Sequence, residues 1–367
     1  MTATSNCMRK ELHQTPRESR RPTYRPSRLL RIGLVVVLVA AAAMIGYALG
    51  ARNANVGAAA VVQQRGFVLP TMQEDGYDGF AMDQNLREVR AVGTTWVELT
   101  PTWSQESRTS SEIFRTKHTV SDAGLERATT MAHQYGLKVF LKPHIDLSNP
   151  RQDSRNKILP ANREEWFASY TAFIGHYAEM AERLGVEQFA MATELSSITE
   201  DRTAWLQVIR AVRARYHGTV LYAAGDDYAR VPFWDALDLI GIDAYWPLST
   251  ESTTDVRVLQ QGWKDYRDEL ADLAATHQRR IVFTEAGFTS QQGTTTAPSD
   301  WRVSTITNED EQAAGYQSLL ATFSDEPWWA GVYWWVWNML PDTAAAPRDF
   351  SPRGKVAEWV IRSWWSK

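Results

Sequence analysis

The chain has 367 residues, 44% of them hydrophobic and 22% charged, which excludes a wholly disordered protein. Residues 1–50 carry 8 Lys/Arg and 2 Asp/Glu, whereas the remainder carries 31 and 41, and this acidic body argues against a nucleic-acid partner. The single cysteine, Cys7, excludes a disulfide or a cysteine-based metal site in the body.

The first 64 residues divide into three segments of different composition. Residues 1–28 are rich in Arg, Pro and Ser and are interpreted as a disordered basic tail. Residues 29–50 contain an uncharged run, 32–49, that is just long enough to cross a bilayer, and residues 51–64 read as a linker. Because the basic flank stays in the cytoplasm, an anchor of this kind leaves the body outside the cell. A signal peptide cleaved near Gly50, which gives a secreted body, is the main alternative, and a buried core helix is a weaker one.

Eight short apolar runs are predicted to be strands, and amphipathic stretches lie between them. The stretches 82–93, 121–136, 162–185, 254–277 and 355–365 have the period of helices. Ser121 and Gly136 bracket the second of them as its N-cap and C′ glycine. The predicted strands are 66–69, 95–99, 138–143, 187–193, 219–224, 239–245, 280–285 and 331–337.

Eight strand–helix pairs in residues 65–367 predict an α/β fold, a closed (β/α)8 TIM barrel. Parallel strands need helical crossovers, and strands covered on both faces read as continuous apolar runs. An open doubly wound sheet is the alternative. That fold usually carries a glycine-rich phosphate loop after its first strand, and the sequence contains no G-x-G-x-x-G or Walker pattern.

Two glutamates end predicted strands, and they are the first candidates for chemistry. Glu194 ends the fourth strand and Glu285 the seventh, and the active site of such a barrel lies at the C-terminal ends of its strands. Strict alternation places Glu285 on one face with Phe283, and Glu194 on one face with Ala192. If these faces line the barrel, both carboxyl groups stand at its mouth and point toward its axis.

Two converging carboxyl groups are what glycoside hydrolysis requires. One must be protonated to protonate the leaving oxygen, and the other must stay ionised to attack the anomeric carbon. The structural alternative is that each strand-end glutamate caps a helix or pairs with an arginine. Glu98, within the second strand, is interpreted in that structural way, as one member of an ion pair.

Five segments, in this order and at these spacings, resemble glycoside hydrolase family 113, a family of the large retaining (β/α)8 clan. The resemblance runs from about Gly66 to Trp365. It implies a β-mannanase with Glu194 as acid/base, Glu285 as nucleophile and β-1,4-mannan or manno-oligosaccharides as substrate. Many relatives in the wider clan place Asn before the acid/base, whereas this chain has Thr193, as the family pattern permits. The segments are ATELSS (192–197), IDAYWPL (242–248), FTEAGF (283–288), GVYWWVWN (331–338) and DFSPRGKVAEWV (349–360).

Further candidates for substrate binding follow from their positions. Tyr245 ends the sixth strand and is expected to donate its hydroxyl to Glu285. Alternation puts Trp335 and Trp337 on one face, where one can form the floor under the reacting sugar, and Trp334 on the other, under the helices. The remaining candidates, with packing or a structural role as the alternative for each, are Trp103, Trp246, Lys142 and His144, and more weakly Asp146, Asp243 and Asn338.

Two long segments, 289–308 and 338–351, are expected to shape the cleft, because loops at this face set substrate choice. Sixteen tryptophans are a heavy load, and many are expected to line a surface or cleft. No cofactor or metal is expected, since there is no H-E-x-x-H pattern, and we expect a monomer. The alternatives to mannan are another polysaccharide, such as xylan, glucan or galactan, and a non-catalytic barrel that binds glycans.

Overall fold

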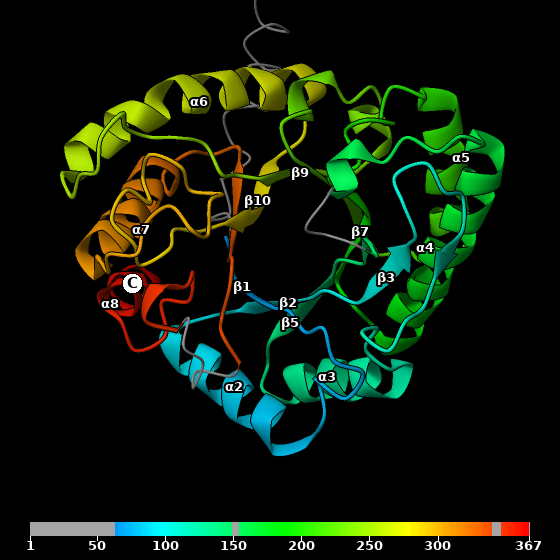
Figure 1. The fold of residues 1–367 in the computed structure, drawn as a ribbon, viewed down its shortest axis with the longest axis horizontal. Coiled ribbons are helices and arrows are strands. Elements are labelled where there is room, and N and C mark those ends of the chain that lie inside the picture. Colours follow the sequence, from blue (N-terminus) through cyan, green and yellow to red (C-terminus); the bar gives the residue numbers. More distant parts are fainter. Residues whose placement is uncertain (1–62, 149–153, 340–345, 367) are drawn as a thin grey trace, which may run out of the picture. The chain divides into compact units, whose positions relative to one another are not determined.

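Eight parallel strands close into a barrel at the centre of the body, as predicted (Figure 1). The computed structural model describes residues 63–148, 154–339 and 346–366. Around the barrel the strands follow the order β1-β11-β10-β9-β8-β7-β5-β2, so neighbours around the barrel are consecutive barrel strands of the chain. Their bounds are β1 Gln64–Leu69, β2 Trp96–Leu99, β5 Lys138–Leu141, β7 Gln188–Thr193, β8 Thr219–Ala224, β9 Leu239–Asp243, β10 Ile281–Ala286 and β11 Trp329–Trp334.

Helices form a ring around the outside of the barrel (Figure 1). Ser121 caps α3 as predicted, because its side chain accepts a hydrogen bond from the backbone of Gly124, and Gly136 adopts φ 68° just past the helix end. The connection from β8 to β9 differs from prediction: it holds only the 3-10 turns η2 Tyr228–Arg230 and η3 Trp234–Ala236. The α-helices among the described residues are α2 Gly79–Val92, α3 Asp122–Gln134, α4 Arg163–Leu184, α5 Arg202–Arg213, α6 Val256–His277, α7 Glu309–Phe323 and α8 Val356–Trp365.

A small three-stranded sheet, which the sequence did not predict, follows the ends of β2 and β5. It consists of β3 Thr102–Gln105, β4 Ile113–Phe114 and β6 His144–Leu147, in the order β4-β3-β6. β3 pairs in parallel with β6 and antiparallel with β4. Because β3 continues the chain from β2, and β6 continues it from β5, this sheet extends one side of the barrel wall beyond its C-terminal edge.

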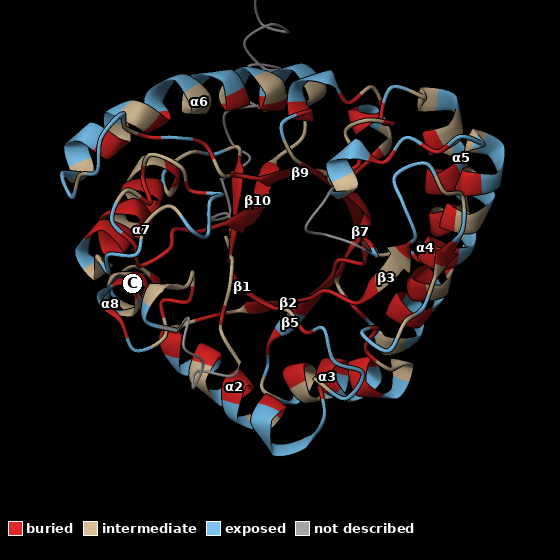
Figure 2. Cartoon of the chain, viewed as in Figure 1, coloured by how far each residue is buried: buried red, intermediate tan, exposed pale blue. Residues whose placement is uncertain are grey.

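Two layers of apolar side chains hold the barrel together. Figure 2 shows buried residues along the strands and on the inward faces of the helices. The inner layer, within the barrel, consists of Val68, Trp96, Phe140, Ala190, Leu221, Ala223, Val282, Ala330 and Tyr333. The outer layer, between strands and helices, contains the fully buried Trp166, Trp205, Trp234, Trp263, Trp329, Trp334 and Trp337. For these seven tryptophans, the expectation that they line a surface or cleft is wrong, since large aromatic rings fill the outer layer instead.

The predicted tail 1–28 and the predicted anchor 29–50 lie outside the described residues, and so does the linker 51–64 except for its last two residues. β1 begins at Gln64, one residue before the predicted start of the barrel domain. Within the described ranges, we find no helix that combines the length and the apolar character needed to span a membrane.

Candidate active site

Both candidate glutamates lie where the pairing of the barrel strands is irregular. The register between β10 and β9 shifts between Phe283 and Glu285, and the register between β7 and β8 shifts between Ala190 and Thr193. Phe283 packs outward, with its ring 5.0 Å from that of Phe323 on α7, whereas Glu285 reaches into the barrel. The predicted common face for these two residues is therefore wrong, because a register shift re-aims a side chain.

Glu194 has a left-handed backbone conformation, with φ 51°. Such a conformation costs a non-glycine residue about 1–3 kcal/mol and persists only where the surroundings enforce it. Here the Glu194 amide donates to the carbonyl of Ala223 at 2.8 Å, and the amide of Leu195 donates to the hydroxyl of Tyr222 at 3.0 Å. That hydroxyl donates in turn to the buried carboxyl group of Asp227. The turn that presents the Glu194 side chain is thus fixed from β8.

Glu285 is almost completely buried and accepts a hydrogen bond at each carboxyl oxygen. Lys142 Nζ donates to Oε1 at 2.6 Å, and the Tyr245 hydroxyl donates to Oε2 at 2.9 Å, which confirms the predicted contact from Tyr245. Burial and the neighbouring Glu285 carboxyl group raise the pKa of Tyr245 well above its ordinary value, so the hydroxyl keeps its proton. The two donors fix the orientation of the Glu285 carboxyl group and suit it to carry a negative charge.

Lys142 is the cation of a buried cluster beneath Glu285. It is fully buried, and its Nζ lies 3.2 Å from Asp243 and 3.4 Å from Glu98. The contact with Glu98 is an ion pair without hydrogen-bond geometry, which confirms the structural interpretation of Glu98. Burial raises the pKa of Glu98 and Asp243 well above their ordinary values. Although burial opposes it, these carboxyl groups together with Glu285 raise the pKa of Lys142, which stays charged.

His144 lies beside this cluster as a neutral, buried side chain. Burial, followed by the charges of Arg155 and Lys142, lowers its pKa well below the ordinary value. Its Nε2 atom has no hydrogen-bond partner in the part of the chain that the structure describes. The ligand atoms of Glu98, His144 and Glu285 lie within 4.8 Å of one another, a spacing that metal ligands can have. The ammonium group of Lys142, however, already contacts both carboxyl groups of this set, so its charge stands where a metal ion would have to bind.

The Glu194 carboxyl group lies in different surroundings from that of Glu285. Its side chain is 31% exposed, and its only hydrogen bond among the described residues comes from Arg155 Nη1, 3.1 Å from Oε2. Burial raises the pKa of Glu194; Arg155 opposes this shift and the nearby Glu285 adds to it. Sequence reasoning did not single out Arg155, because it stands in a polar loop with no motif to distinguish it.

The tryptophans proposed as sugar platforms fall into two groups. Trp335 is partly exposed and packs against the inner layer. Trp337 is buried in the outer layer, where its ring meets Phe67 edge-on at 5.2 Å, so the prediction that it shares a face with Trp335 is wrong. Trp246 is also part of the core, stacked on Tyr266 of α6 at 4.9 Å. Only Trp335 of these three has the exposure that a platform requires.

Two further tryptophans pack against helices. Trp103 donates its Nε1–H to the hydroxyl of Tyr177 on α4 at 2.8 Å, with the guanidinium of Arg115 over its ring. Trp334 lies under the helices as predicted, 4.2 Å from the ring of Tyr316 on α7. Trp103 therefore takes part in the packing of α4, the structural alternative that the sequence left open.

The two long loops are joined to each other beside Tyr245. The amide of Ser290 donates to the carbonyl of Asp349 at 3.0 Å, and Asn338 donates to the Asp349 side chain at 2.9 Å. The ring of Phe350, in the same segment, lies 6.2 Å from that of Tyr245. Loop 289–308 and the segment after β11 thus meet next to the residue that holds Glu285.

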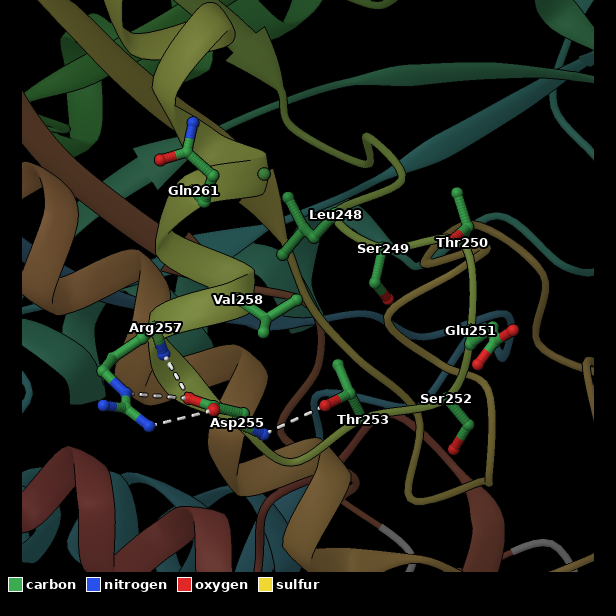
Figure 3. A pocket seen from close by; sticks show the side chains of 11 residues that line it. Leu248, Ser249, Thr250, Glu251, Ser252, Thr253, Asp255, Arg257, Val258 and Gln261 are labelled. Atoms are coloured by element: carbon green, nitrogen blue, oxygen red, sulfur yellow. Dashed lines mark hydrogen bonds and ion pairs between the residues drawn. The ribbon is translucent and has the colours of Figure 1, made fainter.

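A separate cavity of about 870 Å³ lies beside the loop between β9 and α6 (Figure 3). Polar residues such as Ser249, Glu251 and Gln261 line it, and Asp255 pairs with Arg257 at its edge. Neither of the strand-end glutamates nor any other predicted site residue lines this cavity. It is therefore distinct from the carboxyl pair.

Comparison with known proteins agrees with the site geometry. The family model described as Glycoside Hydrolase Family 113 matches residues 69–355. A solved β-1,4-mannanase of that family, in a complex, is 26% identical with a TM-score of 0.76, and the match covers 83% of this chain and 99% of that one. A β-mannanase of the family from Alicyclobacillus acidocaldarius, in complex with ManMIm, is 28% identical with a TM-score of 0.75, over 83% and 97% of the two chains. Comparison with curated proteins gives no match.

The arrangement suits hydrolysis of a glycosidic bond. A buried carboxyl group held by two donors and a partly exposed one with a raised pKa end two strands of a closed parallel barrel. The family model spans most of the barrel that carries them. With its fold, its paired glutamates and this match in agreement, the chain belongs to Glycoside Hydrolase Family 113.

Proposed function

We propose that this glycoside hydrolase is a retaining β-1,4-mannanase that cleaves mannan or manno-oligosaccharides by double displacement. The observation that carries the proposal is the difference between the two strand-end carboxyl groups. Glu285 is buried and held by Lys142 and Tyr245, whereas Glu194 is partly exposed and its pKa is raised by burial. Solved structures 26–28% identical to this chain are β-mannanases of the same family, which supports mannan as the substrate.

In the first step Glu285 is the nucleophile. Its carboxylate attacks the anomeric carbon while Glu194 gives its proton to the glycosidic oxygen, which leaves with the bond electrons. Lys142 and Tyr245 hold the nucleophile in one orientation, so little reorganisation is needed when attack begins. The raised pKa of Glu194 favours its protonated form, which is the form that a general acid requires.

In the second step Glu194 is the base. Water attacks the anomeric carbon, Glu194 takes its proton, and the ester bond to Glu285 breaks, so the product keeps the β configuration. Glu285 carries no negative charge while it is esterified. Its contribution to the raised pKa of Glu194 is then lost, which favours the ionised form of Glu194 when a base is needed.

Two further side chains are proposed to contact the sugar. Trp335 is the candidate floor of the site, since the C–H face of a sugar is apolar and suits an aromatic plane. His144 is neutral and 4% exposed, and its Nε2, which has no hydrogen-bond partner among the described residues, is the proposed contact for a sugar hydroxyl. Lys142, predicted as a direct sugar contact, is fully buried among carboxyl groups, so we assign it to Glu285 instead.

The charge of the site supports a neutral substrate. The site contains two cations and five carboxyl groups. Some of these carboxyl groups have raised pKa values, but the site still has no excess of positive charge. Such a site does not attract a polyuronate, whose sugars are negatively charged. The cations and carboxyl groups of the site are Lys142, Arg155, Glu98, Asp146, Glu194, Asp243 and Glu285.

A substrate panel tests the proposal. The barrel, expressed from Gln63, should release reducing ends from β-1,4-mannan faster than from xylan, glucan or galactan. Glu194→Gln should lower the rate on mannan about 100-fold or more, because general acid catalysis contributes roughly 10²–10⁴-fold. Faster cleavage of another polysaccharide would show that this polysaccharide, and not mannan, is the substrate. Absence of turnover on every glycan, with binding retained, would favour the glycan-binding barrel.

We propose further that the apolar run 32–49 anchors the chain in the cell membrane, with the barrel outside. The basic flank and the uncharged run support this orientation. Full-length chain should remain in the membrane fraction of cells, and externally added protease should degrade the barrel in intact cells. A protein of reduced size in the medium, beginning near residue 51, would instead support cleavage near Gly50.

A further inference from the structure

Arg155 connects the Glu194 carboxyl group to the small sheet. Its Nε donates to the carbonyl of Ile145 at 3.2 Å and to Asp146 Oδ1 at 3.1 Å, and its Nη2 donates to the same Asp146 oxygen at 2.5 Å. These bonds fix one edge of the guanidinium on β6. The opposite nitrogen, Nη1, is directed to Glu194 Oε2 at 3.1 Å.

This contact is unexpected for a group that must donate a proton. A guanidinium beside a carboxyl group stabilises the ionised form, which is useful to a base and unfavourable to an acid. Asp146 limits this effect, because it shares the positive charge of Arg155. The charged and titratable groups that act on Glu194 come from several elements: Arg155 and Asp146 from β6 and the turn after it, Lys142 from the end of β5, Tyr222 from β8, Asp243 and Tyr245 from β9 and its end, and Glu285 from β10.

We propose that Arg155, held by Asp146, is a positioning residue that aims the Glu194 carboxylate and keeps it charged while the glycosyl–enzyme ester is hydrolysed. The proposal rests on the proposed function of Glu194. In that step water forms a bond to the anomeric carbon, the bond to Glu285 breaks, and the proton of water passes to Glu194. Arg155 makes its contact with the same carboxyl group that receives this proton.

Removing Arg155 and removing Asp146 should shift the pH profile of kcat/KM in opposite directions. In the full-length chain, Arg155→Met should raise the pKa of Glu194, so the alkaline limb of kcat/KM should move up by about 1 pH unit. Asp146→Asn should move the same limb down, since the guanidinium then acts on Glu194 alone. Arg155→Lys should recover most of the wild-type profile. Arg215→Met, which removes a surface arginine paired with Glu179, should leave it unchanged.

Hydrolysis of the glycosyl–enzyme ester, the step in which Arg155 is proposed to act, can be measured separately from formation of the ester. The substrate for this is an aryl β-mannoside whose leaving group needs no protonation. Attack by Glu285 is then fast, so Arg155→Met should show a burst of the phenol followed by turnover about 10-fold slower than in wild type. A structural defect would lower the burst amplitude as well. Unchanged pH limbs in both Arg155→Met and Asp146→Asn, or equal rates of turnover after the burst, would overturn the proposal.

If the proposed function is wrong, the wild-type chain will cleave no glycoside, and this result is distinct from those that would overturn the role of Arg155. In that case the titration of Glu194 can be followed by 13C NMR of the labelled carboxyl carbon, with Glu194→Gln to assign the signal. The same opposed shifts in the two variants would support the pairing of Arg155 with Glu194. Identical titration in wild type and Arg155→Met would refute it.

Discussion

Replacing Glu285 by alanine should lower kcat on mannan at least about 10⁴-fold, because in the proposed mechanism it removes the nucleophile and with it the covalent route. Initial rates of reducing-end release, corrected for the fraction of folded protein by near-UV circular dichroism, measure the effect. Glu285→Gln is the matched control, since it keeps the shape and a hydrogen-bonding oxygen for Tyr245 but cannot attack. It should be as inactive as the alanine variant. Wild-type activity in either variant would remove Glu285 from the mechanism.

The stereochemistry of an azide product distinguishes the roles of the two glutamates. In Glu285→Ala, azide can occupy the space below the sugar and attack an aryl β-mannoside from that side, giving the α-mannosyl azide. In Glu194→Ala, the ester to Glu285 still forms, and azide replaces water in the second step, giving the β-mannosyl azide. NMR of the products identifies each anomer. Exchange of the two products between the variants would reverse the assignment of acid/base and nucleophile.

The eight barrel strands could be predicted because each is buried on both faces, which leaves a continuous apolar run in the sequence. Their order follows once the strands are parallel and the connections cross over. The short strands β3, β4 and β6 have two to four residues each, and polar residues interrupt β3 (TWSQ) and β6 (HIDL), so no apolar run marks them in the sequence. They became strands only because the ends of β2 and β5 bring them side by side.

The candidate site shows a similar limit. The positions of Glu194 and Glu285 at strand ends were predictable, and so was the Tyr245 contact, since all three follow from the C-terminal edge of the barrel. Which way a side chain points was not, because the register shifts in β7 and β10 break the alternation on which such a prediction depends. The error at Trp337 has another cause: β11 ends at Trp334, so Trp335 and Trp337 lie outside the strand whose alternation the prediction assumed.

Side chains from distant parts of the chain were the hardest to assign. The sequence around Lys142 does not show whether the lysine contacts a sugar or is a buried counter-ion. Its three carboxyl partners lie on β2, on β9 and on β10, so only the closed barrel brings them together. Arg155 is positioned by β6, an element that was itself not predicted. In both cases the role depends on a tertiary contact rather than on a local pattern.

Lys142→Met should destabilise the barrel by about 3–5 kcal/mol at neutral pH, the usual cost of removing one partner from a buried ion pair. Lys142 is the one cation in the described ranges within ion-pair distance of Glu98, Asp243 and Glu285, and its loss leaves buried carboxyl groups uncompensated. Loss of its hydrogen bond to Glu285 should also lower kcat about 100-fold, the effect of removing one preorganised donor. Urea unfolding and kinetics on mannan measure the two effects.

The stability deficit of Lys142→Met should grow as the pH rises. Glu98 and Asp243 have raised pKa values in the folded chain, and removal of the ammonium raises them further. Below about pH 3 both groups are protonated in the folded and the unfolded chain, so they contribute little to the deficit. Above that pH the unfolded chain loses these protons before the folded variant does, and folding becomes progressively less favourable. Unfolding curves at pH 5 and pH 8 should therefore show the larger difference from wild type at pH 8.

Adding Glu98→Gln to Lys142→Met supplies the control, because it removes one of the uncompensated carboxyl groups without opening a cavity. The double variant should be more stable than Lys142→Met alone, and its deficit should depend less on pH. If the second substitution instead adds its own destabilisation independently of the first, Glu98 and Lys142 are not coupled. The electrostatic explanation of the cluster beneath Glu285 would then be wrong, and the loss in Lys142→Met would reflect packing of the lysine stem alone.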